Sequence, residues 1–247
     1  MGPKHLLDVE PVECVFLERV NRFTVKVLVG DHEEKAHLTN TGRLTDILVS
    51  GRKCLLQVIS GRKMQYRLVG VKIDDDYALI DTILQAKAFE RTVHNQLFPL
   101  LRGCRISKRA PRIGDSVFDY LIECGELAYI VELKSAVMIG SGWEAMYPDC
   151  PTERGRRQVS SLMRLARERS LPRPLIVMIA GFKRARCFKP SRQGDPVMHE
   201  LLSKWVLNGL PLKAASFYMD SRGSIYLEKP ELPLCDDWAS SLHGHAL

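Results

Sequence analysis

The hydrophobic pattern of this chain changes character once, near residue 84, and this change limits the possible folds more than any other feature. Before it, β-branched and apolar runs alternate with glycine turns, over residues 12–29, 53–60, 65–73 and 77–83. Short, regularly spaced strands of this kind are typical of a small all-β barrel or sandwich. A short helix is expected over residues 43–49. The pattern therefore predicts a β-domain over residues 1–84 and a second domain over residues 85–247.

The second domain is predicted to combine helices with strands. Its first helix is expected over residues 86–101, where apolar residues recur at helical spacing. Two further helices are expected, one from Thr152 to about Arg169 and one opened by Asp195-Pro196 and closed by Asn208-Gly209. Strand-like runs occupy residues 104–108, 116–124, 127–135, 174–180, 211–219 and 223–228. The order α-β-β-β-α-β-α-β-β predicts an α/β domain, in a chain that is α+β overall.

Cysteine usage and the absence of a long apolar run indicate the compartment. The seven cysteines are scattered through the chain with no Cys-x-x-Cys pair, which argues against a disulfide framework and against a zinc cage. No apolar run approaches the roughly 20 residues of a membrane-spanning helix, and the N-terminus lacks the apolar stretch of a secretory signal. These features predict a cytoplasmic protein with no membrane partner.

The net charge of +7 is concentrated in the second part of the chain. Residues 1–84 hold twelve basic and twelve acidic residues, whereas residues 85–247 hold 24 basic against 17 acidic. Within residues 152–192, twelve arginines and lysines are opposed only by Glu153 and Glu168. A local field of this kind suits a polyphosphate partner. The alternative from charge alone, a solvated basic face with no partner, stays open.

One group of charged residues could carry out chemistry. Asp119 lies within the strand-like run 116–124, and Glu132-Leu133-Lys134 ends the next one. Residues two apart on a strand share a face, so Glu132 and Lys134 point the same way, and a hairpin would bring Asp119 beside Glu132. Paired carboxylates repel, and a hard cation such as Mg²⁺ relieves that repulsion. Glu90, on the preceding helix, is a candidate third carboxylate.

A Glu-x-Lys sequence is common, so its context decides its meaning. A second example, Glu33 to Lys35, falls in the polar segment DHEEK and is set aside. The pair at Glu132 and Lys134 follows a buried strand instead. An ordinary salt-bridged strand end is the competing interpretation of this pair.

Several longer segments resemble the sugar fermentation stimulation protein A (SfsA) family. They are residues 16–23 (FLERVNRF), 37–44 (HLTNTGRL), 118–121 (FDYL), 131–135 (VELKS) and 147–155 (YPDCPTERG). These segments extend over most of the chain, and several are long. The resemblance implies an N-terminal oligonucleotide-binding (OB) β-barrel followed by an α/β domain of the PD-(D/E)XK nuclease type.

The resemblance also implies roles for the charged residues. Asp119 and Glu132 would be metal ligands and Lys134 the catalytic lysine, with Glu90 as the helix carboxylate. The implied cofactor is Mg²⁺, with Mn²⁺ as an alternative. Two positions depart from the family pattern, because Val117 stands where an arginine is usual and Gln158 where a histidine is usual. These departures affect phosphate contacts around the site more than the metal ligands.

Nucleic-acid contacts are predicted on both parts of the chain. OB barrels bind strands through cationic grooves with aromatic stacking, and Phe23 could supply a stacking platform, although a core position is the competing interpretation. The predicted nucleic-acid-binding residues are Arg19, Arg22, Arg43, Arg154, Arg157 and Arg164. The neutral total of residues 1–84 makes the basic helix after Thr152 the stronger candidate surface.

Three functions remain open from the sequence. The first is a DNA-binding protein with a Mg²⁺-dependent phosphodiesterase site. The second is a non-enzymatic DNA-binding regulator of sugar metabolism genes that retains a nuclease-type fold. The third is a hydrolase of small nucleotides or phosphodiesters, which needs the same metal site in a closed pocket. The predicted partner is DNA, and a homodimer is an open alternative.

Overall fold

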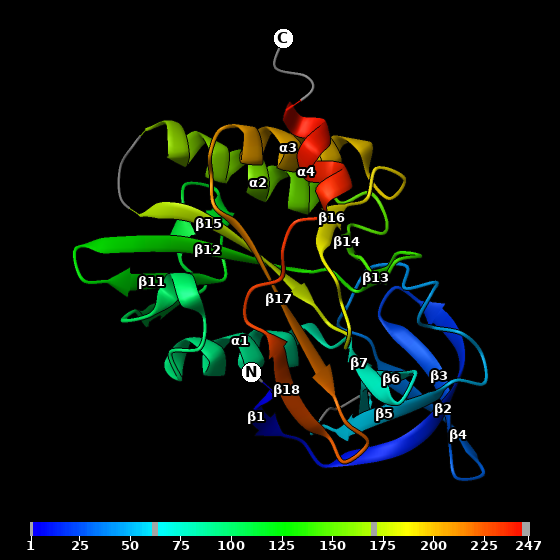
Figure 1. The fold of residues 1–247 in the computed structure, drawn as a ribbon. Coiled ribbons are helices and arrows are strands. Elements are labelled where there is room, and N and C mark those ends of the chain that lie inside the picture. Colours follow the sequence, from blue (N-terminus) through cyan, green and yellow to red (C-terminus); the bar gives the residue numbers. More distant parts are fainter. Residues whose placement is uncertain (1, 61–63, 169–171, 244–247) are drawn as a thin grey trace.

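The computed structural model describes residues 2–60, 64–168 and 172–243 (Figure 1). Five strands of its N-terminal part are β2 (Pro11–Asn21), β3 (Thr24–Val29), β4 (His32–His37), β5 (Lys53–Val58) and β6 (Tyr66–Ile73). They pair in the order β4-β3-β2-β5-β6, and a parallel pairing of β4 with β6 closes the ring. Alternate side chains such as Val25 and Val27 are fully buried inside it. The predicted β-barrel is confirmed.

The remaining elements form the α/β part of the chain. The helices are α1 (Thr82–His94), the 3₁₀ turn η1 (Pro99–Leu101), α2 (Glu153–Arg167), α3 (Pro196–Leu207) and α4 (Asp236–His243). The longer strands are β7 (Asp76–Leu79), β8 (Arg105–Arg109), β11 (Tyr120–Cys124), β12 (Leu127–Ser135), β15 (Arg173–Ala180), β17 (Leu212–Met219) and β18 (Ser224–Lys229). The other strands are β1 (Lys4–Asp8), β9 (Arg112–Ile113), β10 (Ser116–Val117), β13 (Met138–Ile139), β14 (Ala145–Tyr147) and β16 (Phe188–Pro190).

The central strands are covered by helices on both faces. β12, β15 and β17 run parallel, while β11 and β8 continue the sheet in antiparallel pairing. Helices α2, α3 and α4 lie on one side of these strands and α1 on the other (Figure 1). Side chains of β15 therefore alternate between two cores, with Ile176 and Met178 in the core that includes α2, and Leu175 and Val177 in the core that includes α1. A strand buried on both faces reads as a continuous apolar run.

Side-chain caps set the start of each main helix. Asp81 accepts a hydrogen bond from Leu84 N and starts α1 at Thr82, four residues earlier than the hydrophobic spacing predicted. Thr152 and Asp195 cap α2 and α3 at the predicted positions. The predicted end of the second helix, Arg169, lies outside the described residues.

Two local predictions are wrong, and one strand was not predicted. Residues 45–47 form a turn rather than the expected short helix. The predicted strand 116–124 is divided into β10 and β11, which leaves Asp119 between them. Strand β1 was not expected, and it pairs with β18 at the other end of the chain. Such a pairing depends on contacts between residues more than 200 positions apart, which local patterns do not contain.

The disulfide prediction is also wrong, because the structure contains disulfides at Cys14–Cys54, Cys104–Cys124 and Cys187–Cys235. Cys14 and Cys54 are directly opposite in the register of β2 and β5, so strand pairing brings together cysteines 40 residues apart. This removes the support that cysteine scatter gave to a cytoplasmic location. Among the described residues, no helix is long and apolar enough to cross a membrane.

Gly181 lies where the barrel meets the α/β sheet, and its carbonyl accepts a hydrogen bond from Leu79 N at 2.6 Å. A Cβ at this position would lie 2.3 Å from the Leu79 carbonyl oxygen and 2.7 Å from a methyl of Val137. We expect Gly181→Ala to lower the free energy of unfolding by about 3 kcal/mol, because backbone must move to relieve the overlap. A thermal denaturation curve would show this as a melting temperature lower by roughly 10 °C. An unchanged melting temperature would contradict the close approach.

Candidate functional site

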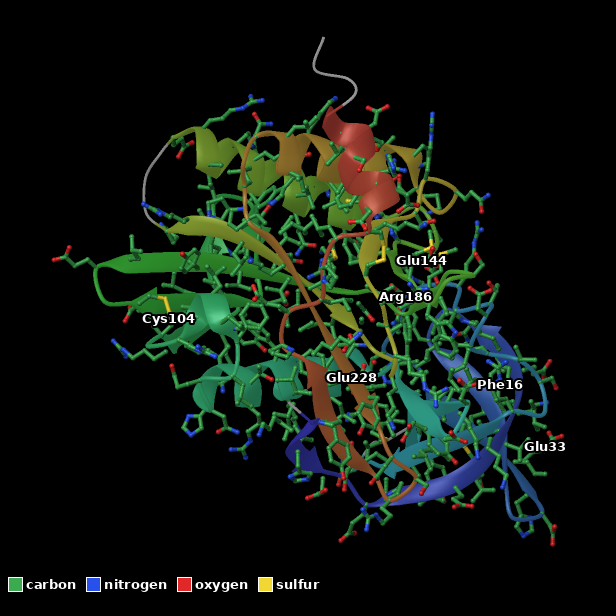
Figure 2. The ribbon with its side chains drawn as sticks, viewed as in Figure 1. Phe16, Glu33, Cys104, Glu144, Arg186 and Glu228 are labelled. Carbon is green, nitrogen blue, oxygen red and sulfur yellow. A yellow bond between two sulfur atoms is a disulfide. The ribbon has the colours of Figure 1, made fainter. Side chains whose placement is uncertain are left out.

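The centre of the candidate site is a buried ion pair at the end of β12. Lys134 Nζ donates a hydrogen bond to Glu132 Oε1 at 2.6 Å, and the two side chains are 9% and 4% exposed. The strand alternation that predicted a shared face therefore holds for this pair. The second Glu-x-Lys is remote from it, because Glu33 lies at the outer edge of the barrel (Figure 2).

Asp119 joins this pair although it lies between β10 and β11. Its backbone N–H donates to the Val131 carbonyl, which holds it in register with β12, and its Oδ2 accepts a hydrogen bond from Leu133 N at 2.7 Å. Burial raises the pKa of Asp119, while the hydrogen bond from Leu133 and the charge of Lys134 oppose that rise. The strand break thus places a desolvated carboxylate beside Glu132.

Glu132 has an unusual environment for a carboxylate. Burial raises its pKa to about 7, and the nearby charge of Asp119 adds to this, whereas Lys134 lowers it. Its Oε2 is buried and has no hydrogen-bond partner in the described structure. An unsatisfied buried oxygen next to a second carboxylate is costly unless a cation is bound there. The donor set, carboxylate oxygens only, fits a hard divalent cation such as Mg²⁺ or Ca²⁺.

Gln158 of α2 fixes the position of Lys134. Lys134 Nζ donates to Gln158 Oε1 at 2.8 Å, and Gln158 Nε2 donates to the Val117 carbonyl at 3.1 Å. Burial disfavours the charge of Lys134, but Glu132 and Tyr147 outweigh it, and the net effect raises the lysine pKa. The sequence reasoning noted Gln158 only as a departure. A stronger signal was available, because this polar residue lies one turn before Leu162 on the buried face of α2.

These groups line a cavity of about 440 Å³ between the two parts of the chain. The α/β part contributes Asp119, Glu132 and Lys134, and the barrel contributes Arg22 and Phe23, together with Thr39–Gly42. Asn40 Nδ2 donates to Ser135 Oγ at 3.0 Å. A second hydrogen bond joins the α/β part to the barrel, from Leu44 N to Asp149 Oδ2 at 2.7 Å. The barrel therefore forms one wall of the site.

The three barrel arginines predicted to bind nucleic acid have different surroundings. The hydrogen bonds of Arg19 lie within its own domain, where its guanidinium donates to the carbonyls of Asn21, Arg22, Gly42 and Arg43. Arg22 lines the cavity that contains Glu132, and Arg43 lines a smaller adjoining cavity. Arg19 thus shapes the loops around the site, and Arg22 is the barrel arginine that faces it.

Glu90 is not brought into the carboxylate pair. Arg109 donates to it through Nε and Nη2, at 2.7 and 2.9 Å, and the Tyr120 hydroxyl donates at 3.1 Å. It shares a neighbouring cavity with Asp119. Within the part of the chain that the structure describes, no set of three or more His, Cys, Asp and Glu residues is arranged to hold a metal ion. The two carboxylates of Asp119 and Glu132 are therefore the protein ligands that the geometry offers.

A basic groove runs along α2 next to the site. It has a volume of about 1090 Å³, and its lining includes Arg112, Arg154, Arg156, Arg157, Arg164, Arg167 and Lys204 with one carboxylate, Asp115. Arg154 and Gln158 line both this groove and the cavity that contains Glu132. Arg156 forms a bidentate ion pair with Asp195. The predicted basic residues Arg154, Arg157 and Arg164 thus lie together.

The chain is therefore a two-domain protein, in which a closed five-stranded barrel is joined to an α/β domain with a buried carboxylate–lysine site. The profile described as "SfsA N-terminal OB domain" matches residues 17–80, and the one described as "Sugar fermentation stimulation protein RE domain" matches residues 83–223. The chain belongs to the sugar fermentation stimulation protein (SfsA) family, and its barrel is an OB barrel.

Relatives align with this chain over most of its length. The sugar fermentation stimulation protein homologue of Pyrococcus furiosus is 42% identical over 221 residues, covering 89% of this chain and 95% of the relative. The homologue of Archaeoglobus fulgidus is 37% identical, covering 92% and 97%. A solved structure of Pyrococcus furiosus SfsA in complex with Ca²⁺ superimposes with a TM-score of 0.89 at 41% identity, covering 94% of this chain and 99% of the other.

Proposed function

We propose that this protein is a DNA-binding, divalent-metal-dependent phosphodiesterase, a nuclease of the PD-(D/E)XK type. The observation that carries the proposal is the unpaired buried Oε2 of Glu132, which lies with Asp119 and Lys134 in a cavity open to a basic groove. The solved structure of the Pyrococcus furiosus relative is a Ca²⁺ complex, which supports the binding of a divalent cation. Mg²⁺ is the proposed physiological ion, and Mn²⁺ would substitute for it.

Each residue of the site has a role in this proposal. Asp119 and Glu132 hold the cation through carboxylate oxygens. When bound, the cation supplies a water of lowered pKa and neutralises charge on the phosphate. Glu132 raises the pKa of Lys134 in the metal-free protein, and the ammonium group would act as a fixed positive charge toward the phosphoryl oxygens. Gln158 positions that ammonium group.

The basic groove favours a polymeric substrate over a small nucleotide. A single nucleotide would fill the cavity at Glu132, and the arginines along α2 would have no ligand. A DNA strand that extends from the cavity would place successive phosphates beside Arg154, Arg157 and Arg164. Each neutralised phosphate releases counterions, so binding should weaken steeply with salt.

Arg157→Ala is expected to weaken DNA binding several-fold and to the same extent for unrelated sequences. Arg157 is exposed in the groove, where it would read phosphates rather than bases. The slope of log K against log salt should become shallower by about 1. Fluorescence anisotropy over a salt series measures both quantities. Arg222→Ala is the matched control, because this exposed arginine lies in the β17–β18 turn, far from α2 (Figure 1). Losses that depend on sequence would contradict a phosphate-reading role.

The proposed activity is tested with labelled single-stranded, duplex and branched DNA in Mg²⁺, in Mn²⁺ and in EDTA. Cleavage that requires the metal and stops in EDTA is the expected result. Intact DNA in every sample, with binding retained, would replace the nuclease proposal with a non-enzymatic DNA-binding regulator. Cleavage of a dinucleotide at the same rate as a long strand, with little salt dependence, would favour a small-phosphodiester hydrolase.

A further inference from the structure

Phe23 is the most exposed aromatic side chain among the described residues. It is 49% exposed, whereas the other seventeen aromatic side chains of Phe, Trp and Tyr are buried or half-buried. It does not pack in the barrel core. It lines the cavity that contains Asp119, Glu132 and Lys134. An exposed aromatic ring at the mouth of a polar site indicates a binding surface.

The backbone that carries Phe23 is held firmly. Phe23 N donates to Asn21 Oδ1 at 2.9 Å, and its carbonyl accepts from Leu38 N at 2.9 Å. Arg19 binds the neighbouring Arg22 carbonyl at 3.0 Å and also binds the loop at Gly42 and Arg43. The ring is thus presented on a rigid turn that the Arg19 guanidinium ties to the loop beside the site. A ring on a fixed backbone has only its own side-chain torsions to order when a ligand stacks on it.

The charges around the ring indicate what stacks on it. The Arg22 guanidinium lies 5.6 Å from the centre of the Phe23 ring. Arg22, Lys134 and Arg154 all line the same cavity. An aromatic face beside cations matches a nucleotide, whose base stacks while its phosphate meets the positive charge. A hydrophobic protein partner would not need these cations.

We propose that Phe23 is a stacking platform for an unpaired base next to the phosphate that a cation at Asp119 and Glu132 would hold, so that the substrate is single-stranded or locally unpaired DNA. The phosphate part of this inference rests on the proposed function. A base inside a duplex is already stacked on both faces, and only an unpaired base can offer a face to the ring. The strand would then pass from Phe23 through the cavity to Arg154 and the groove along α2.

The test compares binding of a fluorescent single-stranded oligonucleotide and its duplex by anisotropy in EDTA, so that it does not depend on the metal or on cleavage. Phe23→Leu is expected to weaken single-strand binding about tenfold, the loss of roughly one stacked base, with little change for the duplex. Phe23→Trp should retain the affinity, because it keeps an aromatic face. Val58→Ala, which alters another exposed apolar side chain of the barrel, should change neither.

A second measurement locates the base. Removing single bases from the oligonucleotide should weaken wild-type binding most at one position. The affinity of Phe23→Leu should not change when the base at that position is removed. Equal losses for single strand and duplex, or Phe23→Trp behaving like Phe23→Leu, would overturn the proposal. An unchanged DNA affinity with altered self-association in light scattering would assign Phe23 to a protein interface instead, which also overturns it.

The outcomes separate this inference from the proposed nuclease. Metal-dependent cleavage, together with an unchanged single-strand affinity of Phe23→Leu, would support the nuclease proposal and contradict the stacking role of Phe23. A selective loss of single-strand binding in Phe23→Leu, when the wild-type protein cleaves no DNA, would support the stacking role of Phe23 and contradict the nuclease proposal.

Discussion

Glu132→Gln is expected to raise the melting temperature in the absence of metal and, at the same time, to abolish divalent-cation binding. Burial raises the pKa of Glu132 from its ordinary 4.5 to about 7. Between these two values the folded protein binds more protons than the unfolded chain, so the free energy of unfolding falls as pH rises from about 4.5 to about 7. Above pH 7 the full cost is present, roughly 3 kcal/mol for a shift of this size.

The glutamine variant removes this cost because it is neutral at every pH and its Oε1 can still accept from Lys134. At pH 8 without metal we expect its melting temperature to exceed that of wild type by on the order of 5–10 °C. Saturating Mg²⁺ or Ca²⁺ should stabilise wild type and leave the variant unchanged. Differential scanning calorimetry at pH 5 and pH 8 with and without the ion measures all of these effects. Glu126→Gln, an exposed carboxylate in the β11–β12 turn, is the control and should show none of them. A variant less stable than wild type at pH 8 would show that Glu132 is an ordinary structural ion pair.

Lys134→Met is expected to lower single-turnover DNA cleavage by about 10²- to 10³-fold, the usual effect of removing one group that stabilises transition-state charge. Methionine keeps the volume of the side chain but removes the ammonium group that contacts Glu132 and Gln158. Both carboxylates proposed to bind the cation remain, so binding of the cation and of DNA should persist. Lys35→Met is the matched control, because it changes the lysine of the second Glu-x-Lys, an exposed residue on β4. Cleavage at the wild-type rate in Lys134→Met would exclude Lys134 from the chemistry.

The order of elements was predictable from sequence because it depends on local periodicity. The run 127–135 is β12 exactly as its apolar pattern indicated, and the alternation on that strand already placed Glu132 and Lys134 on one face. Caps at Thr152 and Asp195 were equally local signals. These features need no knowledge of distant parts of the chain.

The features that sequence reasoning missed depend on distant contacts. The pairing of β1 with β18 and the disulfide between Cys14 and Cys54 arise from strand register, which no local pattern contains. The surroundings of Arg19 and Glu90 are also tertiary. Arg19 was expected to contact nucleic acid, but it holds the loop beside the site, and Glu90 is held by Arg109. In both cases the residue type gives the charge, but the contacts of that charge depend on which groups the fold places beside it.

We propose that Asp119 and Glu132 together hold a divalent cation next to Lys134. Anomalous diffraction from crystals of the wild-type protein soaked in Mn²⁺ tests it most directly. We predict a manganese peak in contact with a carboxylate oxygen of Asp119 and with Oε2 of Glu132, and its disappearance in Glu132→Gln. A map without a peak at these two carboxylates at saturating Mn²⁺ would contradict this metal site, and the buried pair of Glu132 and Lys134 would then be a structural salt bridge.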